Sequence, residues 1–120
     1  MKILYLMPPD ALESPAKLLR GIAHLYEKQP ETHCVGTAYR DAVGQAHCDL
    51  GEATSCCIAG AMAIADPTCQ QWPLRELAID ALRAEINPKA IGRWSDSTPL
   101  PEIIATLRRA ADQLEHQKVA

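Results

Sequence analysis

Apolar side chains recur every three or four residues in four stretches of this chain, which is the spacing of one face of an α-helix. The stretches span residues 14–29, 54–65 and 73–86, and a last one begins at Thr98 and reaches Leu114. The pattern therefore predicts four amphipathic helices. The inward positions expected for the second helix are Ile58, Ala61, Met62 and Ala65, and those for the third are Leu74, Leu77, Ala78, Ala81, Leu82 and Ile86. Those expected for the last helix are Leu100, Ile103, Ile104, Leu107, Ala111 and Leu114.

Local signals place the ends of these helices. Ser14 is a good N-cap with Pro15 at the first helical position, and Pro30 ends that helix. Thr54 or Ser55 is expected to cap the second helix, and Thr98 the last one. The stops after the second and third helices are Asp66-Pro67 and Asn87-Pro88.

The segments between these stretches have no helical period. Residues 1–9 predict an N-terminal arm or short strand, cut off by Pro8-Pro9. Residues 31–53 predict either a short β-hairpin, with strands at 32–39 and 45–50, or an ordered loop. Residues 87–97 are expected to form a loop. The expectation is a mainly α fold in a single small domain, residues 1–120, with the last helix packed across the helix that carries Cys57.

Composition supports a packed interior made of small and aliphatic residues. The chain is 48% apolar and 22% charged and contains no Phe, so Leu, Ile and Ala must fill the core. The net charge of −3 argues against a nucleic-acid-binding surface. The apolar run at residues 3–7 is too short for a membrane span or a signal peptide. We therefore expect a cytoplasmic protein without nucleic-acid or membrane partners.

Five cysteines, an odd number, argue against a disulfide framework in a reducing compartment. Free buried thiols are one interpretation. The other is a structural zinc site formed by Cys34, Cys48, Cys57 and Cys69, although no Cys-x-x-Cys knuckle is present. We expect no cofactor, with zinc as the alternative.

Cys57 has a physical route to reactivity, because a helix N-terminus stabilises a thiolate. A hydrolase would also need a histidine base, for which His24, His33 and His47 are candidates, with Asp41 or Asp96 as the orienting group. The alternative is that Cys57 is a small packing residue beside Gly60 and Ala61, which let helices approach closely.

The order of four motifs resembles that of a known family. The motifs are Ala38-x-x-Asp41-x-x-Gly44, Ala53-x-x-x-Cys57-x-x-Gly60-Ala61, Ile91-x-x-Trp94-Ser95-Asp96 and Glu102-Ile-Ile. Over residues 38–114 the chain is similar to a family of small uncharacterised proteins of bacteriophages and actinobacteria. That family has an Asp-x-x-Gly turn, a Cys-x-x-Gly-Ala helix and a Trp-Asn-Asp motif before the last helix. The resemblance implies a phage or prophage origin but no activity.

Ser95 stands where the family has Asn, which removes an amide's paired donor and acceptor. Trp94 and Asp96 either anchor and cap the last loop or form a binding pocket with Cys57 and Ser95. Asp41 and Gly44 fit a turn in which Asp bonds local backbone and Gly adopts positive φ.

These observations favour a small, non-enzymatic interaction protein that binds and modulates another protein. The chain has no complete catalytic set and no nucleic-acid face. The first alternative is a cysteine-dependent enzyme or small-ligand binder centred on Cys57, Trp94 and Asp96. The second is a zinc-stabilised domain. Pairing of two copies through the last helix, near Leu114, is a further expectation.

Overall fold

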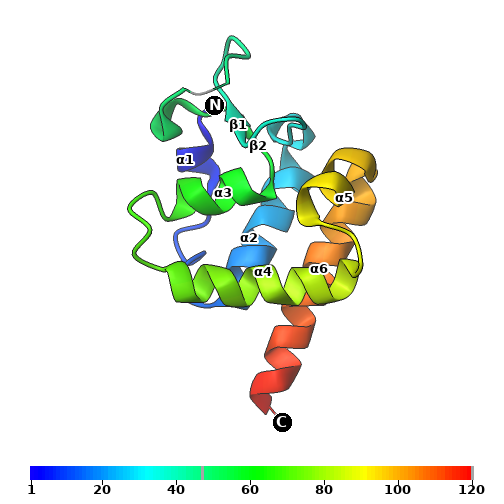
Figure 1. Ribbon diagram of the computed structural model, residues 1–120. Coiled ribbons are helices and arrows are strands. Elements are labelled where there is room, and N and C mark those ends of the chain that lie inside the picture. Colours follow the sequence, from blue (N-terminus) through cyan, green and yellow to red (C-terminus); the bar gives the residue numbers. More distant parts are fainter. Residues whose placement is uncertain (47, 120) are drawn as a thin grey trace.

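The computed structural model describes residues 1–46 and 48–119, and within them the chain forms a mainly α domain with a two-stranded sheet. This confirms the predicted fold class (Figure 1). In chain order the elements are α1 (Ile3–Leu6), α2 (Pro15–Lys28), the 3-10 turn η1 (Pro30–Thr32), β1 (Tyr39–Arg40), the 3-10 turn η2 (Leu50–Glu52), β2 (Ser55–Cys56), α3 (Ile58–Ala65), α4 (Trp72–Ile86), α5 (Ile91–Ser97) and α6 (Leu100–Val119).

Helices α2, α4 and α6 pack against one another and contain much of the core. Leu19 and Ile22 of α2 and Leu107 of α6 are fully buried. Arg20 adds polar contacts between α2 and α6, because its guanidinium pairs with Asp112 and Glu115. Figure 1 shows the last turns of α6 projecting beyond α4.

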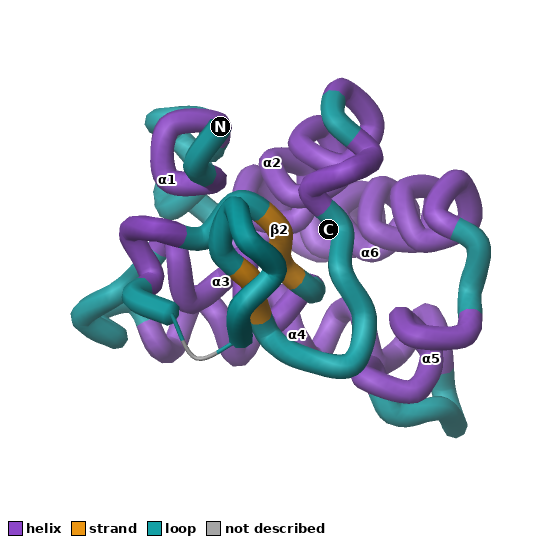
Figure 2. The backbone as a smooth tube through the Cα atoms, turned by 90° about the horizontal axis from the view of Figure 1, so that it is seen from above, coloured by secondary structure: helices purple, strands orange, loops and turns teal. Residues whose placement is uncertain are grey.

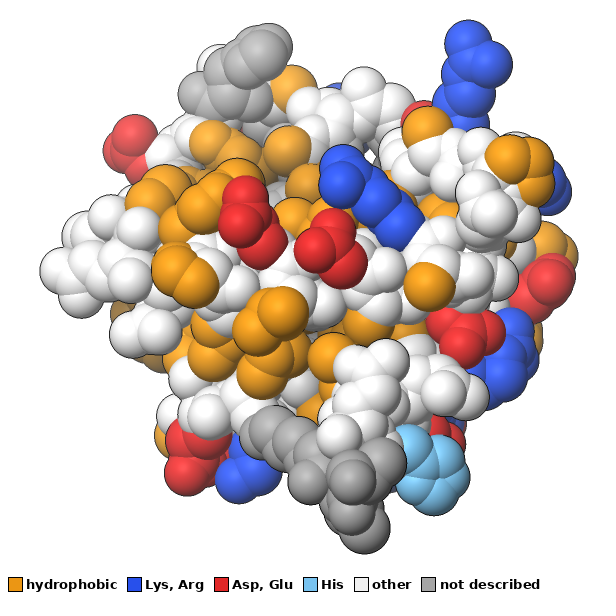
Figure 3. All heavy atoms as spheres, turned by 60° about the horizontal axis from the view of Figure 1, so that its bottom comes forward, with side chains coloured by type: hydrophobic (Ala, Val, Ile, Leu, Met, Phe, Trp, Pro, Cys, Tyr) orange, Lys and Arg blue, Asp and Glu red, His pale blue; other side chains and the backbone are white. Residues whose placement is uncertain are grey.

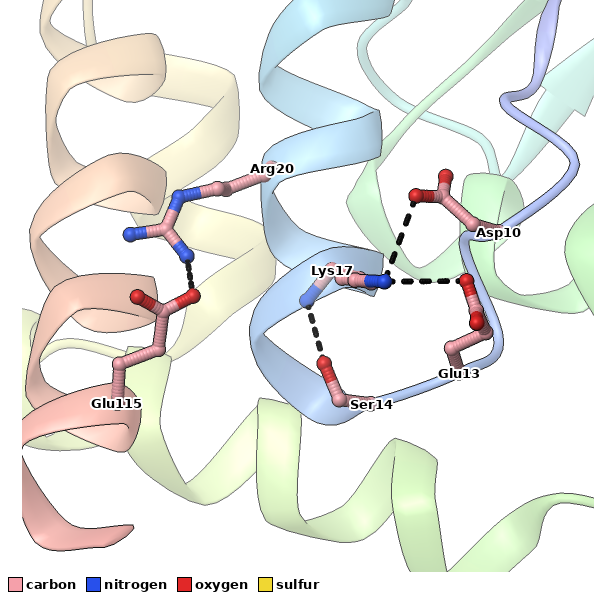
Figure 4. A network of polar contacts seen from close by, with 6 residues as sticks. All are labelled: Asp10, Glu13, Ser14, Lys17, Arg20 and Glu115. Carbon is pink, nitrogen blue, oxygen red and sulfur yellow. Dashed lines mark hydrogen bonds and ion pairs between the residues drawn. The ribbon is translucent and has the colours of Figure 1, made fainter. Parts of the chain in front are cut away.

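The start of α2 follows the predicted cap. The Oγ of Ser14 accepts a hydrogen bond from the N–H of Lys17 at 3.1 Å, and Pro15 takes the first helical position. The ammonium of Lys17 lies 3.1 Å from Glu13 and 3.7 Å from Asp10 (Figure 4). The chain before α2 is thereby tied to the first turn of the helix.

The arm or strand predicted at the N-terminus is wrong, because residues 3–6 form the single helical turn α1. Ile3 is buried there, and its N–H donates to the carbonyl of Ala53 at 2.8 Å. Within the described residues, the sheet contains only β1 and β2, so this segment has no strand partner. The burial of the Ile3 side chain therefore fixes the position of residues 3–6.

The two-stranded element expected between the first two predicted helices is present, but its strands are not those predicted at 32–39 and 45–50. β1 pairs with β2, and in the described part of the chain it meets residues 45–50 only through a single antiparallel bridge between Arg40 and Ala46. The pairing of β1 with β2 is antiparallel and sets Tyr39 opposite Cys56 and Arg40 opposite Ser55. Ser55 therefore belongs to a strand and not to a helix cap. The two short strands lie beside α3 (Figure 2).

Three further expectations about the last three helices are wrong. Residues 91–97 form α5 rather than a loop. Helix α6 begins at Leu100, and the carbonyl of Pro99 rather than a Thr98 side chain accepts its first hydrogen bonds. It packs mainly on α2 and α4, not across α3, because the buried face of α2 occupies the centre.

Helix α4 occupies the predicted residues and stops at Asn87, but not every predicted inward position is buried. Ala78 and Leu82 are buried, whereas Leu77 is 54% exposed. Figure 3 brings the α4 side forward and shows hydrophobic side chains interspersed with acidic and basic ones. No helix in the described part of the chain is both long and apolar enough to cross a membrane.

Candidate functional site

A cavity of about 390 Å³ lies between residues 36–37, the start of α3, the middle of α4 and the start of α5. Figure 1 shows α3 and α5 above α4. Most of the cavity wall is apolar, formed by Ile58, Met62, Ile79 and Ile91. The polar residues on its wall are Thr37, Cys57, Arg83, Ser95 and Asp96. The cavity therefore joins three of the residues that the sequence singled out.

Cys57 caps α3 and lies on the cavity wall. Its extended backbone follows β2, and its N–H donates to the carbonyl of Ala38 at 2.8 Å. Its Sγ accepts a hydrogen bond from the N–H of Gly60 at 3.4 Å. The predicted caps, Thr54 and Ser55, are wrong because β2 extends the backbone until Cys57.

Ser95 and Asp96 reach the cavity from α5, whereas Trp94 is buried in the core. The Ser95 hydroxyl lies 3.3 Å from Nε2 of His33. One oxygen of Asp96 accepts a hydrogen bond from the N–H of Gly36 at 3.4 Å. Asp96 thus fixes the loop before β1 and does not cap α6.

His33 is the described histidine nearest to this arrangement. Its ring packs edge-on against Tyr26, with 5.0 Å between the ring centroids. Burial lowers the pKa of His33 below its ordinary 6.5, and the charge of Asp96 opposes this shift. His33 is therefore neutral at pH 7 and can accept or donate one hydrogen bond at each ring nitrogen, depending on its tautomer.

A cysteine–histidine pair is not formed within the described residues. The ring of His33 bonds Ser95 rather than Cys57. His24 is exposed on α2 and lines a different hollow beside Glu115. His47, the third candidate base, lies outside the described residues.

Asp41 and Gly44 form the predicted turn, apart from the cavity. The carboxylate of Asp41 accepts hydrogen bonds from the N–H groups of Val43 and Gln45, at 3.1 and 2.9 Å. Gly44 has a φ of 85°, the conformation that favours glycine. These two residues shape the chain after β1 and do not join Cys57.

The other cysteines do not form one cluster: the N–H of Cys34 donates to the Cys56 carbonyl at 3.2 Å, whereas Cys48 lines a different hollow. Cys34 and Cys56 are buried, Cys48 is half-buried, and Cys69 is exposed between α3 and α4. In the part of the chain that the structure describes, no three His, Cys, Asp or Glu side chains are grouped so that they could hold a metal ion. The set Cys34, Cys48, Cys57 and Cys69 accordingly forms no metal site there.

Sequence reasoning missed two features of the site. Arg83 lines the cavity from α4, yet in the sequence it is one charged position on a predicted helix. The contact between His33 and Ser95 joins residues 62 positions apart, and no local pattern signals it. Both follow from how α4 and α5 are placed beside the loop before β1.

Comparison with known proteins gives a family and no activity. A family model described as "Family of unknown function (DUF6197)" matches residues 10–113. No curated protein and no solved structure matches the chain.

Proposed function

The chain belongs to this family of unknown function, DUF6197, and we propose that it binds a small organic molecule in the cavity between α3, α4 and α5. The observation that carries the proposal is the convergence of Cys57, Ser95 and Asp96 on one hollow of about 390 Å³. Ligand pockets in proteins measure roughly 300–1,000 Å³ and combine apolar walls with a few polar groups. This cavity has both properties.

The wall suggests the chemistry of the occupant. Ile58, Met62, Ile79 and Ile91 offer contacts to an apolar body. The carboxylate of Asp96 has four lone-pair positions, of which the Gly36 N–H uses one. We therefore expect a ligand with an apolar body and a hydrogen-bond donor, such as an amine or amide N–H, directed at Asp96.

Gly92 offers a way to test the cavity without disturbing the core. It lines the cavity, and a Cβ built on it would meet no atom of the described residues within 4 Å. The Gly92→Leu variant should fold normally and fill part of the hollow. We expect ligand-observed NMR with a set of small aromatic and aliphatic amines to give hits with the wild-type protein and lose them with this variant.

Gly51→Leu is the matched control. Among the residues that the structure describes, a Cβ at Gly51 also meets no atom within 4 Å, and Gly51 is not part of the cavity wall. The control variant should retain the wild-type hits. Amines that bind Gly92→Leu as well as the wild type would contradict the proposal, and so would the absence of any hit. Asp96→Asn should weaken the amines more than uncharged amides.

The sequence-based hypothesis of a non-enzymatic interaction protein is a second candidate. Trp72 and Leu77 of α4 favour it, because they are 46% and 54% exposed and would suit a protein partner. The phage or prophage origin, the cytoplasmic location and the pairing of copies through α6 stay predictions. We do not propose a cysteine hydrolase, since His33 bonds Ser95 and not Cys57.

A further inference from the structure

Cys69 and Arg75 form a second cluster, none of whose residues lines the cavity. Cys69 lies in the turn between α3 and α4 and its side chain is exposed. Arg75, in the first turn of α4, is only 7% exposed. Its Nη1 donates to Sγ of Cys69 at 3.7 Å. A thiol that solvent reaches is thus held against a buried guanidinium.

The neighbours of Arg75 fix its position. Nη1 lies 3.6 Å from a carboxylate oxygen of Asp66, which is itself buried. The Asp66 carboxylate also accepts hydrogen bonds from the N–H groups of Gln70 and Gln71, each at 3.0 Å. The guanidinium carbon lies 4.8 Å from the ring centroid of Trp72, a cation–π contact. These contacts therefore fix the guanidinium of Arg75 next to the sulfur of Cys69.

One donor of Arg75 is unsatisfied. Its Nε is buried and has no hydrogen-bond partner among the described residues. A buried donor without a partner is costly, and most such groups in folded proteins are paired. The orphaned Nε belongs to the same guanidinium whose Nη1 contacts Sγ of Cys69, and sulfur is a weak acceptor. An oxygen atom on the sulfur would give this guanidinium a stronger acceptor on its Cys69 side.

We propose that Cys69 is a site of oxidation by hydroperoxides, and that Arg75 holds the oxygen of the resulting sulfenic acid. In this step the sulfur attacks one peroxide oxygen, an S–O bond forms and the O–O bond breaks. The departing oxygen takes the thiol proton and leaves as water from hydrogen peroxide, or as an alcohol from an organic hydroperoxide. Sulfur loses two electrons and the peroxide gains them, and the modification is reversible by thiols.

The test compares Cys69 with Cys48 in one sample. Cys48 is a half-buried thiol that shares a hollow with Asp41, Asp49 and Glu52 and has no guanidinium beside it in the described contacts. The reduced full chain is treated with hydrogen peroxide and dimedone, and labelled peptides are quantified by mass spectrometry. We expect Cys69 to be labelled about tenfold faster than Cys48, the effect of one favourable charged hydrogen bond on a barrier. In the urea-unfolded chain the two rates should be equal.

Two variants on the same helix separate Arg75 from a general effect of α4. Arg75→Lys keeps the charge but loses Nη1 and Nε, and it should bring Cys69 to the rate of Cys48. Arg83→Lys changes an exposed arginine, and the labelling rate of Cys69 should stay at its wild-type value. Equal labelling of the two thiols in the folded wild type would overturn the proposal. A folded Arg75→Lys variant with unchanged Cys69 labelling would overturn it too. Should Arg75→Lys not fold, the wild-type ratio decides.

Discussion

Gly60 is the residue that lets the backbone of Ala38, directly before β1, lie on α3. A Cβ at this position would overlap the carbonyl oxygen of Ala38 and come within 3.3 Å of the Cβ of Cys56. That same carbonyl accepts the N–H of Cys57. The absence of a side chain at Gly60 thus sets the distance between the strand and the cap of α3, and with it one wall of the cavity.

Gly60→Ala should therefore destabilise the protein by at least about 3 kcal/mol, the upper range for overpacked positions. The obstacle is backbone, which has little freedom to move. Urea unfolding followed by circular dichroism measures the change. Gly51→Ala should stay within about 0.5 kcal/mol of the wild type, because its Cβ meets no atom within 4 Å. Equal stability of the two variants would show that the Ala38 backbone does not press on α3.

At the scale of the element, the sequence predicted long helices well and short ones badly. Helices α2, α4 and α6 have 14 to 20 residues, enough for several turns of an apolar stripe. Helices α1 and α5 have four and seven, too few for the period to emerge. The pairing of Tyr39 with Cys56 escaped prediction because strands of two residues carry almost no pattern.

Some residues of the candidate site could be predicted from the sequence and others could not. Cys57, Ser95 and Asp96 could be selected from the sequence because their residue types bring chemistry. The sequence leaves Trp94 open between an anchor on the core and a cavity wall, since an indole suits both, and the structure buries it in the core. Arg83 and the partnership of His33 with Ser95 depend on contacts between remote segments, which only the fold supplies.

Two leucines at predicted inward positions, one in α6 and one in α4, are expected to contribute very differently to the stability of the protein. Leu107 of α6 is fully buried between helices, so Leu107→Ala should cost about 2–5 kcal/mol. Leu77 of α4 is 54% exposed, so Leu77→Ala should change stability by no more than about 0.5 kcal/mol. Chemical unfolding of both variants checks this. Similar losses for the two leucines would mean that α4 presents a different face to the core.

For the whole molecule, buried ionisable groups set the upper and lower pH limits between which the folded state is most stable. Burial raises the pKa of Cys56 from 9.0 to about 12, and it also raises the pKa of Tyr26, whose hydroxyl donates to the Cys56 carbonyl. Above pH 9 the unfolded chain loses these protons first, so stability falls as pH rises towards 12. Burial lowers the pKa of His33, so its contribution is lost as pH falls below 6.5.

Cys56→Ala should flatten the alkaline part of this profile. Removing the thiol removes the proton that the folded state retains between pH 9 and about 12. The measurement is the free energy of urea unfolding from pH 7 to pH 11 under reducing conditions. Cys69→Ala, which removes an exposed thiol, should keep the wild-type slope. A Cys56→Ala profile parallel to that of the wild type would contradict the assignment.

The sulfur of Cys57 belongs both to the first turn of α3, through the Gly60 N–H, and to the wall of the cavity. A ligand that moves the Cys57 sulfur away from Gly60 leaves the Gly60 amide without its hydrogen bond. A ligand that holds the sulfur in place strengthens this cap of α3. Such coupling is reciprocal, so whatever secures the first turn of α3 weakens the binding of the first kind of ligand and tightens the binding of the second. The rate at which the Gly60 amide exchanges its hydrogen with solvent is therefore a gauge of occupancy, readable before the occupant has been identified.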